Sequence, residues 1–356
     1  MTPKERVYKA LNHEIPDRVP LMYRDVPEVR KRLKEDLDLH TDDDLFEYFD
    51  IDFRWVAPKY TGPELEDPET GYKKDYYGVQ YKYTKFSETA GHWNVVDPPL
   101  KDVHDPAVLE DYPWPTLDCW DFSEMKETCK TYEQYAIMTA PGILSSPGLL
   151  QSVIQPLIGV ERSLTDMYVN PEFLEALIEK ILEFQCKYIE KMMSSANGRI
   201  DFFRIGDDFG TQQGLLISPE MFRRFFLPGF KKMADIAKKY GAHYYQHSCG
   251  SVRELIPAFL ETGVEVLDPV QVGAKGMDPA ELKAEFGESL CFSGGVDEQQ
   301  LLREDTPEQV AEGVKKLIET MDYGKGFFIG PTHNFQDDIP TENIVAMYEA
   351  AKGGKL

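Results

Sequence analysis

From about residue 121 onward, short apolar runs alternate with longer segments whose apolar residues have helical spacing. Several of the helical segments open with a capping residue followed by proline, as at Asn170-Pro171, Ser218-Pro219 and Thr306-Pro307. Such alternation is typical of a parallel sheet, because each strand needs a crossover before the next can run in the same direction. The sequence therefore predicts an α/β fold built on a parallel sheet.

The predicted strands are spread along most of the chain. They are residues 19–23, 135–139, 201–205, 243–247, 264–267, 289–292 and 326–330. With the strand at Val19–Tyr23 included, about eight strand–helix units fit into the chain. We predict a closed (β/α)8 TIM barrel rather than an open nucleotide-binding sheet, since the sequence has neither a G-x-G-x-x-G after a strand nor a G-x-x-x-x-G-K.

The first part of the chain is interpreted as an N-terminal helical and β-meander extension. Thr2, Pro3 and Glu5 form a capping box that begins a helix. Residues 51 to 120 are rich in tyrosine and tryptophan and alternate in polarity, which indicates an antiparallel insertion within a single domain of residues 1–356. Its aromatic side chains either line a ligand pocket or pack the insertion against the main body.

The composition excludes two classes of partner. The formal net charge is −23, and such a surface repels phosphate backbones and anionic lipids, so we expect no nucleic-acid and no membrane role. No apolar run approaches the roughly 20 residues that span a bilayer. The charged N-terminus does not resemble a signal peptide. Five cysteines at irregular spacing form no disulfide framework, which favours a reducing cytoplasm.

The strongest chemical signal is the stretch from His247 to Gly250, which ends an apolar run. Imidazole nitrogen and thiolate sulfur are ligands that zinc prefers. Because residues i and i+2 of an extended chain point to the same face, His247 and Cys249 can reach one ion. Gly250 allows a tight turn beside them. The simpler alternative is a buried histidine beside an inert thiol.

Other polar residues follow other predicted strands, where a barrel of this type builds its active site. Asp207 and Asp208 follow one strand, and His333 follows the last. His247, Cys249 and His333 would make three protein ligands with an open fourth position, the arrangement of a catalytic zinc site.

Each of these residues has an alternative role. The alternative for Asp207 and for Asp208 is to cap the turn that follows them. His333 alternatively hydrogen-bonds a substrate. Cys291 is the reserve metal ligand, although its place before a Gly-Gly turn suggests a buried strand residue, and His243 is expected in the core.

Several motifs together resemble the uroporphyrinogen decarboxylase superfamily over nearly the whole chain. They are Thr2–Val7, Pro16–Pro20, Gly206–Gln212, Ser218–Phe222, His247–Gly250 and Pro340–Ile344. True decarboxylases have a Met-Arg-Gln-Ala-Gly-Arg pattern after the first strand, with two arginines that hold substrate propionates. Arg24 stands one place past the first arginine and Pro27 replaces the second. Tyr23 and Arg24 are the predicted substrate contacts.

The chain is more similar to the corrinoid-dependent methyltransferases of this superfamily, which bind zinc through a His-x-Cys pair and a later Cys. His247 and Cys249 match the pair, and His333 replaces the later Cys. The resemblance implies a zinc-dependent methyltransferase that moves a methyl group from a small methoxylated, aromatic substrate to the cob(I)alamin of a separate corrinoid protein. In this reading Asp207 and Asp208 are the catalytic acids, as a fourth ligand or a proton shuttle.

Three alternatives stay open at this point. The first is a uroporphyrinogen-type decarboxylase that needs no metal and depends on Arg24. The second is a methylcorrinoid:thiol methyltransferase. The third is a non-catalytic folding or cofactor partner of a corrinoid protein. Whether the chain forms a homodimer is also open.

Overall fold

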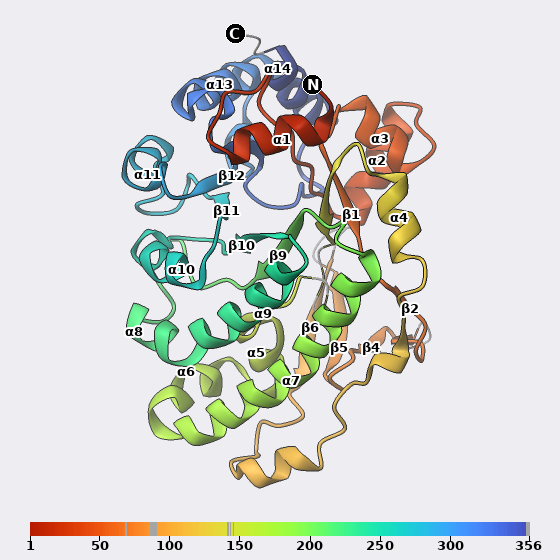
Figure 1. Ribbon diagram of the computed structural model, residues 1–356, viewed down its shortest axis with the longest axis vertical. Coiled ribbons are helices and arrows are strands. Elements are labelled where there is room, and N and C mark those ends of the chain that lie inside the picture. The colour runs from red at the N-terminus through yellow and green to blue at the C-terminus, as the bar shows by residue number, and fades with distance from the viewer. Residues whose placement is uncertain (68–69, 86–90, 141, 143, 145, 354–356) are drawn as a thin grey trace.

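The computed structural model describes residues 1–67, 70–85, 91–140, 142, 144 and 146–353 (Figure 1). Its central element is a parallel sheet of seven strands, hydrogen-bonded in the order β1-β8-β9-β10-β11-β12-β13. The strands are β1 (Phe53–Val56), β8 (Ala136–Thr139), β9 (Phe202–Gly206), β10 (His243–His247), β11 (Val266–Val270), β12 (Cys291–Val296) and β13 (Phe327–Pro331). The parallel sheet predicted from the alternation is confirmed.

The extended segment 19–25 lies between the two edges of this sheet. Leu21 forms a parallel bridge with Ile329 of β13, and its carbonyl accepts a hydrogen bond from the Asp52 N–H, just before β1, at 3.1 Å. The sheet therefore curls until both of its edge strands approach the same segment, and the fold is TIM-barrel-like. The predicted first strand is at the expected place, but it makes isolated bridges rather than a continuous ladder.

One strand of the main sheet differs from the sequence analysis. Residues 53–56, which the sequence analysis placed in the insertion 51–120, form β1 and pair in parallel with β8, with Phe53 opposite Ala136. This strand has only four residues, and the aromatic segment follows it with no helix between them. The sequence pattern therefore placed residues 53–56 in the antiparallel insertion. The antiparallel part of the insertion begins only after Val56.

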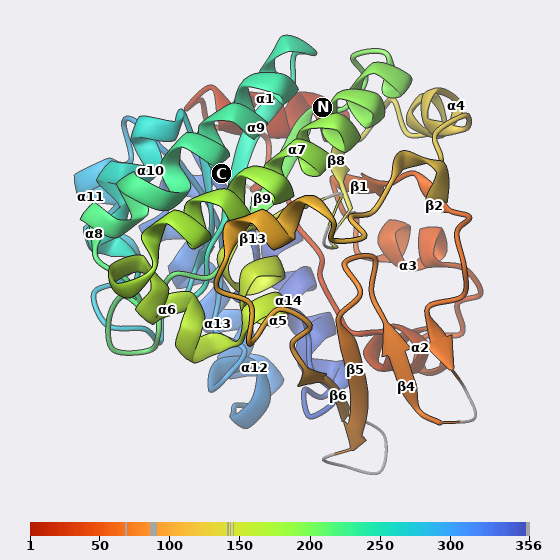
Figure 2. The same cartoon turned by 90° about the horizontal axis from the view of Figure 1, so that it is seen from below.

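A separate antiparallel sheet of four strands has the order β3-β4-β5-β6. Its strands are β3 (Glu66–Asp67), β4 (Tyr72–Lys74), β5 (Gln80–Lys85) and β6 (Gly91–Asp97), and β2 (Lys59–Tyr60) pairs with β7 (Trp120–Asp121). Figure 2 shows β4, β5 and β6 at the periphery of the molecule. Tyr83 packs edge-on against Trp93 at 5.3 Å, and the Lys73 ammonium lies 4.5 Å from the Trp93 ring. These aromatic residues stabilise the small sheet itself.

Helices cover the outer face of the main sheet, as α7 and α9 do beside β9 (Figure 1). The α-helices are α1 (Pro3–Leu11), α2 (Pro27–Asp36), α3 (Asp42–Tyr48), α4 (Met125–Thr131), α5 (Gln155–Ile158), α6 (Val160–Val169), α7 (Pro171–Ala196), α8 (Pro219–Met221), α9 (Leu227–Lys239), α10 (Ile256–Thr262), α11 (Pro279–Phe286), α12 (Leu301–Glu304), α13 (Pro307–Thr320) and α14 (Thr341–Gly353). Short π- or 3-10 helices are η1 (Pro106–Glu110), η2 (Leu117–Cys119), η3 (Leu150–Ile154), η4 (Phe222–Phe226), η5 (Arg253–Leu255) and η6 (Asp322–Gly324). None of the described helices combines the length and apolar character that a bilayer span requires.

The strands are buried on both faces. Alternate residues of each strand belong to two clusters: Phe203 and Phe327 pack under the outer helices, whereas Phe202 and Phe328 belong to a smaller cluster with residues of α1. The predicted capping box begins α1, since the Thr2 hydroxyl accepts the Glu5 N–H at 3.2 Å and the Glu5 carboxylate accepts the Thr2 N–H at 2.9 Å. Helix α1 therefore closes the amino-terminal end of the sheet.

A buried carboxylate connects α1, the segment 19–25 and β1. Asp52 is fully buried and accepts hydrogen bonds from Arg6 at 2.6 Å, Arg18 at 2.7 Å and the Leu21 N–H at 2.7 Å. Three parts of the chain thus depend on one charged group.

We predict that Asp52→Ala lowers the free energy of unfolding by about 3–5 kcal/mol, because two largely buried arginines lose their partner. Urea denaturation followed by circular dichroism measures this loss. The matched control is Glu35→Ala, which removes a solvent-exposed pair with Lys31 at 3.8 Å and should change stability little. Equal losses of stability in the two variants would show that Asp52 does not stabilise the contact of α1 and the segment 19–25 with β1.

Candidate metal centre

The carboxyl ends of three neighbouring strands bring polar side chains together. His247 is the last residue of β10, and it stands directly opposite Asp268 of β11 and Gly206 of β9 in the sheet register. Asp208 lies two residues after β9, and Cys249 lies two residues after β10. The sheet register therefore places donors from the ends of two strands next to one another.

The turn after β10 is fixed by a close approach of two loops. Gly250 has φ +88°, and a Cβ added there would lie 2.5 Å from the Gly210 carbonyl carbon. The Cys249 N–H donates to the Asp208 Oδ1 at 2.8 Å, and the Ser251 N–H donates to the Thr211 carbonyl at 2.8 Å. Only glycine fits at position 250, as predicted, and the turn holds Cys249 against the loop that carries Asp208.

Asp208, His247 and Cys249 form a donor set with the dimensions of a metal site. One ligand atom of each lies within 4.8 Å of the others. The Cys249 Sγ is 3.5 Å from the His247 Nε2, and the Asp208 Oδ1 is 3.6 Å from the same nitrogen. Zinc–sulfur and zinc–nitrogen bonds of about 2.3 and 2.0 Å at a tetrahedral angle separate the two donors by about 3.5 Å. The donor set therefore fits a zinc ion with little rearrangement.

A carboxylate behind the imidazole fixes its orientation. The Asp268 Oδ2 lies 2.7 Å from the His247 Nδ1 and accepts a hydrogen bond from the Arg24 Nη1 at 2.7 Å. Burial acts to raise the pKa of Asp268, but Arg24 and His247 hold it well below its usual range, so this side chain is a carboxylate. A histidine that binds a metal through one nitrogen commonly gives its other N–H to a carboxylate. The pair thus directs the His247 Nε2 toward Asp208 and Cys249.

The protonation states of the donors follow from their surroundings. Burial and the neighbouring Arg204 lower the pKa of His247, so its imidazole is neutral near pH 7. Burial and the Asp208 carboxylate raise the pKa of the Cys249 thiol. A metal ion bound here would displace the thiol proton, since the thiolate is the ligand form.

His333, predicted as the third ligand, lies beside this donor set and not within it. It lines the same cavity of about 270 Å³ as His247 and Asp208. Among the described histidine, cysteine and acidic residues, however, the group within 4.8 Å contains Asp208 in its place. Burial and Arg24 lower the pKa of His333 to about 4, so it is neutral near pH 7. It fits the alternative role of hydrogen-bonding a substrate.

Asp207 is buried and engaged in holding a loop. Its carboxylate accepts hydrogen bonds from the N–H groups of Leu149 at 2.7 Å, Gln151 at 2.9 Å and Ser152 at 3.2 Å. Burial and Asp208 raise the pKa of Asp207 to about 7. The structure therefore favours the capping alternative for Asp207 and leaves Asp208 as the carboxylate available for chemistry.

The two reserve residues lie away from the donor set. Cys291 begins β12, and its Sγ is 3.4 Å from the Leu11 carbonyl and 3.5 Å from the His13 Nε2. His243 begins β10, four residues before His247, and pairs with Glu265 at 2.8 Å. Both belong to the amino-terminal end of the sheet, so the reserve assignment of Cys291 as a ligand is wrong. His243 is half-buried and hydrogen-bonded to Glu265 rather than a core residue.

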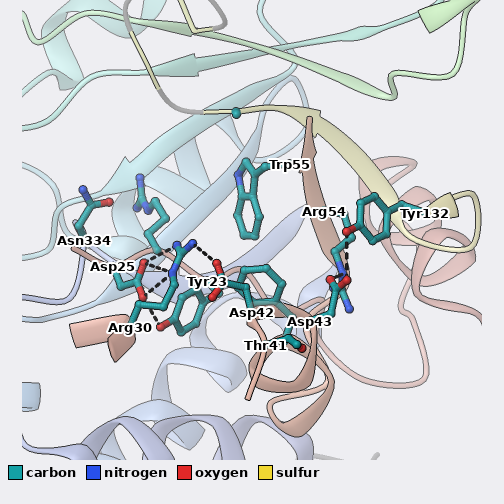
Figure 3. A pocket seen from close by; sticks show the side chains of 13 residues that line it. Tyr23, Asp25, Arg30, Thr41, Asp42, Asp43, Arg54, Trp55, Tyr132 and Asn334 are labelled. Atoms are coloured by element: carbon teal, nitrogen blue, oxygen red, sulfur yellow. Dashed lines mark hydrogen bonds and ion pairs between the residues drawn. The ribbon is translucent and has the colours of Figure 1, made fainter. Parts of the chain in front are cut away.

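The predicted substrate contacts, Tyr23 and Arg24, line a second, larger cavity of about 440 Å³ (Figure 3). Arg24 is buried, with its Nη2 donating to the Pro331 carbonyl at 2.8 Å. The Tyr23 hydroxyl donates to the Asp25 Oδ2 at 2.6 Å. Both side chains therefore shape the cavity walls, and the Tyr23 hydroxyl and two of the three Arg24 guanidinium nitrogens are bonded within the protein, whereas the Arg24 Nε has no hydrogen-bond partner among the described residues.

Sequence reasoning missed Asp268 and Arg204. Arg204 comes from β9, donates to the Ser146 hydroxyl at 2.8 Å, and lies 3.8 Å from Asp268. The available signal was a charged residue inside each of two apolar strands, since a buried charge needs a partner. The predicted strand 264–267 ended one residue before Asp268.

Comparisons with known proteins agree with this architecture. The family model described as uroporphyrinogen decarboxylase (URO-D) matches residues 84–354. A solved structure described as a methyltransferase from Methanosarcina mazei superposes with a TM-score of 0.67 at 18% identity, covering 99% of this chain and 98% of that one. This likeness shows the shared fold.

Two curated relatives carry different activities in their names. A methylcobamide:CoM methyltransferase of Methanosarcina acetivorans is 26% identical over 193 residues, 53% of this chain and 52% of the relative. A uroporphyrinogen decarboxylase of Aliarcobacter butzleri is 24% identical over 180 residues, 50% of this chain and 48% of the relative. The chain thus spans about half the length of the curated relatives it matches. Since the family model covers most of it, the chain belongs to the uroporphyrinogen decarboxylase family.

Proposed function

We propose that this protein is a zinc-dependent methyltransferase. It moves a methyl group from a methoxylated aromatic substrate to the cob(I)alamin of a separate corrinoid protein. The observation that carries the proposal is the donor set of Asp208, His247 and Cys249 with the Asp268 carboxylate behind the imidazole. Three protein ligands with room for a fourth are the arrangement of a catalytic zinc site.

Asp208, His247 and Cys249 would hold the zinc ion. Bound there, zinc supplies a Lewis acid for the ether oxygen of the substrate. In the reaction the methyl–oxygen bond breaks, its electron pair stays with the oxygen, and the methyl group passes to the cobalt. The oxygen then gains a proton, and the product is a phenol. The chemistry at the cobalt belongs to the cofactor, while the chain orients the reacting groups.

Two further residues have separate roles, since Asp268 positions a metal ligand and His333 faces the substrate. Asp268 keeps the His247 ring in one orientation through the 2.7 Å contact, so the metal-binding nitrogen is in place before binding. His333 is neutral near pH 7 and lines the same cavity, so its N–H can donate a hydrogen bond to the departing oxygen, which takes its proton from water.

The alternative as a decarboxylase has less support from the site. The Arg24 guanidinium is already bonded to Asp268 and to the Pro331 carbonyl, which leaves it poorly placed to hold a substrate propionate. Two relatives are named methylcobamide:CoM methyltransferases, which makes transfer to a thiol the second candidate. The donor set argues against a thiol acceptor. It has one thiolate and one carboxylate, and carboxylate is a hard ligand, whereas a site for a soft thiol is expected to contain more thiolates.

We infer that the whole chain works as one domain and receives its cobalamin only from the partner protein. Five free cysteines suit a reducing compartment such as the cytoplasm.

The first prediction concerns metal content. The purified chain should hold about one zinc per molecule, measured by mass spectrometry after dialysis, and Cys249→Ala or Asp208→Ala should lose most of it, because each removes one of three ligands. Asp268→Asn should weaken zinc binding about 10- to 100-fold through the misoriented imidazole.

Two control variants accompany this measurement. Cys119→Ala removes a free cysteine of η2 and should retain the full zinc content. His333→Ala should also retain it. If His333→Ala loses zinc while Asp208→Ala keeps it, the ligand set proposed here is wrong.

The second prediction concerns activity. With reduced cobalamin and a methoxylated arene, the zinc-loaded chain should form methylcobalamin, which is followed by its absorbance, and Asp208→Ala should slow this reaction about 100-fold or more. Asp235→Asn, an exposed acid of α9 paired with Lys231, is the matched control and should leave the rate unchanged. Carbon dioxide release from uroporphyrinogen without methyl transfer would instead support the decarboxylase.

A further inference from the structure

The larger cavity adjoins the one that holds the metal donors. Arg24 and Asn334 line both of them, and the larger cavity encloses about 440 Å³ between β1, α2 and α3 (Figure 3). A substrate whose methoxy group reaches the donor set would therefore extend into this cavity. The lining of the larger cavity determines which kind of molecule fits there.

Trp55 and Phe46 give this cavity two aromatic walls. Trp55 comes from β1, and Figure 3 shows its indole pointing into the cavity. Phe46 comes from α3, and its ring centroid lies 5.6 Å from that of Trp55. An aromatic ligand gains both apolar contact area and a favourable ring–ring geometry against such walls.

The charged groups around the cavity are already paired with one another. Arg30 donates to Asp25 at 2.6 Å and to Asp42 at 2.9 Å. Arg54 lies 3.6 Å from Asp43. The guanidinium of Arg54 also donates to the carbonyls of residues 51 and 53 and stacks on the Tyr135 ring at 3.7 Å.

The pairing of these charges disfavours an anion. Apart from Arg24, whose charge is matched by Asp268, the described lining contains three aspartates and two arginines. A ligand carboxylate would meet these three aspartates, and the cations that face them, Arg30, Arg54 and Lys34, are already paired with them. Burying a carboxylate there would require desolvation free energy that an uncharged ring does not require.

From this lining we infer that the larger cavity binds the aromatic ring of the substrate, and that it selects an uncharged methoxyarene over one that carries a carboxylate. The inference rests on the proposed function for the position of the methoxy group. The recognition itself depends on the Trp55 wall and on the paired charges of Asp25, Asp42 and Asp43.

The experiment measures binding directly, without turnover. The zinc-loaded full chain is titrated by calorimetry near pH 7 with 2-methoxyphenol, which is uncharged, and with 4-hydroxy-3-methoxybenzoate, which is the same ring with a carboxylate. We expect the uncharged probe to bind at least about tenfold more tightly. Equal affinities, tighter binding of the benzoate, or no binding of the uncharged probe would each overturn the inference.

Two pairs of variants locate the selectivity. Trp55→Ala should weaken 2-methoxyphenol binding about tenfold, whereas Trp93→Ala, on the peripheral sheet, should not change it. Asp42→Asn removes one negative charge and one of the two oxygens that accept from Arg30 and Lys34, so it should improve benzoate binding several-fold and leave the uncharged probe unaffected. Asp235→Asn is the charge-matched control away from the cavity. Asp42 is partly exposed, so this variant tests the inference even where Trp55→Ala is unstable.

The results separate this inference from the proposed function. Selective binding of the uncharged ring without methylcobalamin formation would leave the cavity assignment standing and refute the methyltransferase. Methyl transfer from the benzoate, together with an affinity equal to or higher than that of 2-methoxyphenol, would support the methyltransferase and overturn the selectivity proposed here.

Discussion

The candidate site depends on one buried carboxylate. Asp268 is fully buried, and it contacts Arg24 at 2.7 Å, His247 at 2.7 Å and Arg204 at 3.8 Å. These partners come from the segment before α2, from the end of β10 and from β9, so the carboxylate connects parts of the chain that are distant in sequence. Removing one partner of such a buried group costs about 3–5 kcal/mol, because a charge is left without compensation. The same contacts that stabilise this end of the sheet therefore also set the orientation of the His247 imidazole, the proposed metal ligand.

The sequence contained most of the fold and about half of this site. The parallel sheet, the capping box of α1 and the turn at Gly250 depend on local rules, namely hydrophobic period, side-chain capping and backbone freedom, and each was predictable from residues near in sequence. The pairing of β1 with β8 was not predictable, because a four-residue strand followed by an aromatic antiparallel segment has no local feature that assigns it to the main sheet.

The ligands show the same limit. His247 and Cys249 share a strand end, so their spacing alone brings them together. Whether Asp208 or His333 completes the set depends on how far each loop reaches across the end of the barrel, and a sequence does not state that distance. Asp207 and Asp208 are adjacent and chemically identical, yet one caps the loop at 149–152 and the other faces the donors. Only the direction of each side chain separates their roles.

The position of Arg24 separates metal binding from substrate selection. Its guanidinium is held by Asp268 and the Pro331 carbonyl, and it forms part of the wall of both cavities. The metal donors come from the loops after β9 and β10, which the sheet register holds in place. The aromatic walls come instead from α3 and β1, on the other side of Arg24. Substitutions in α2, α3 or β1 are therefore expected to change the lining of the larger cavity without moving the donors, because Arg24 stays bonded to Asp268 and Pro331 between the two cavities. In the proposed function, this division would let the substrate change while the donor set stays the same.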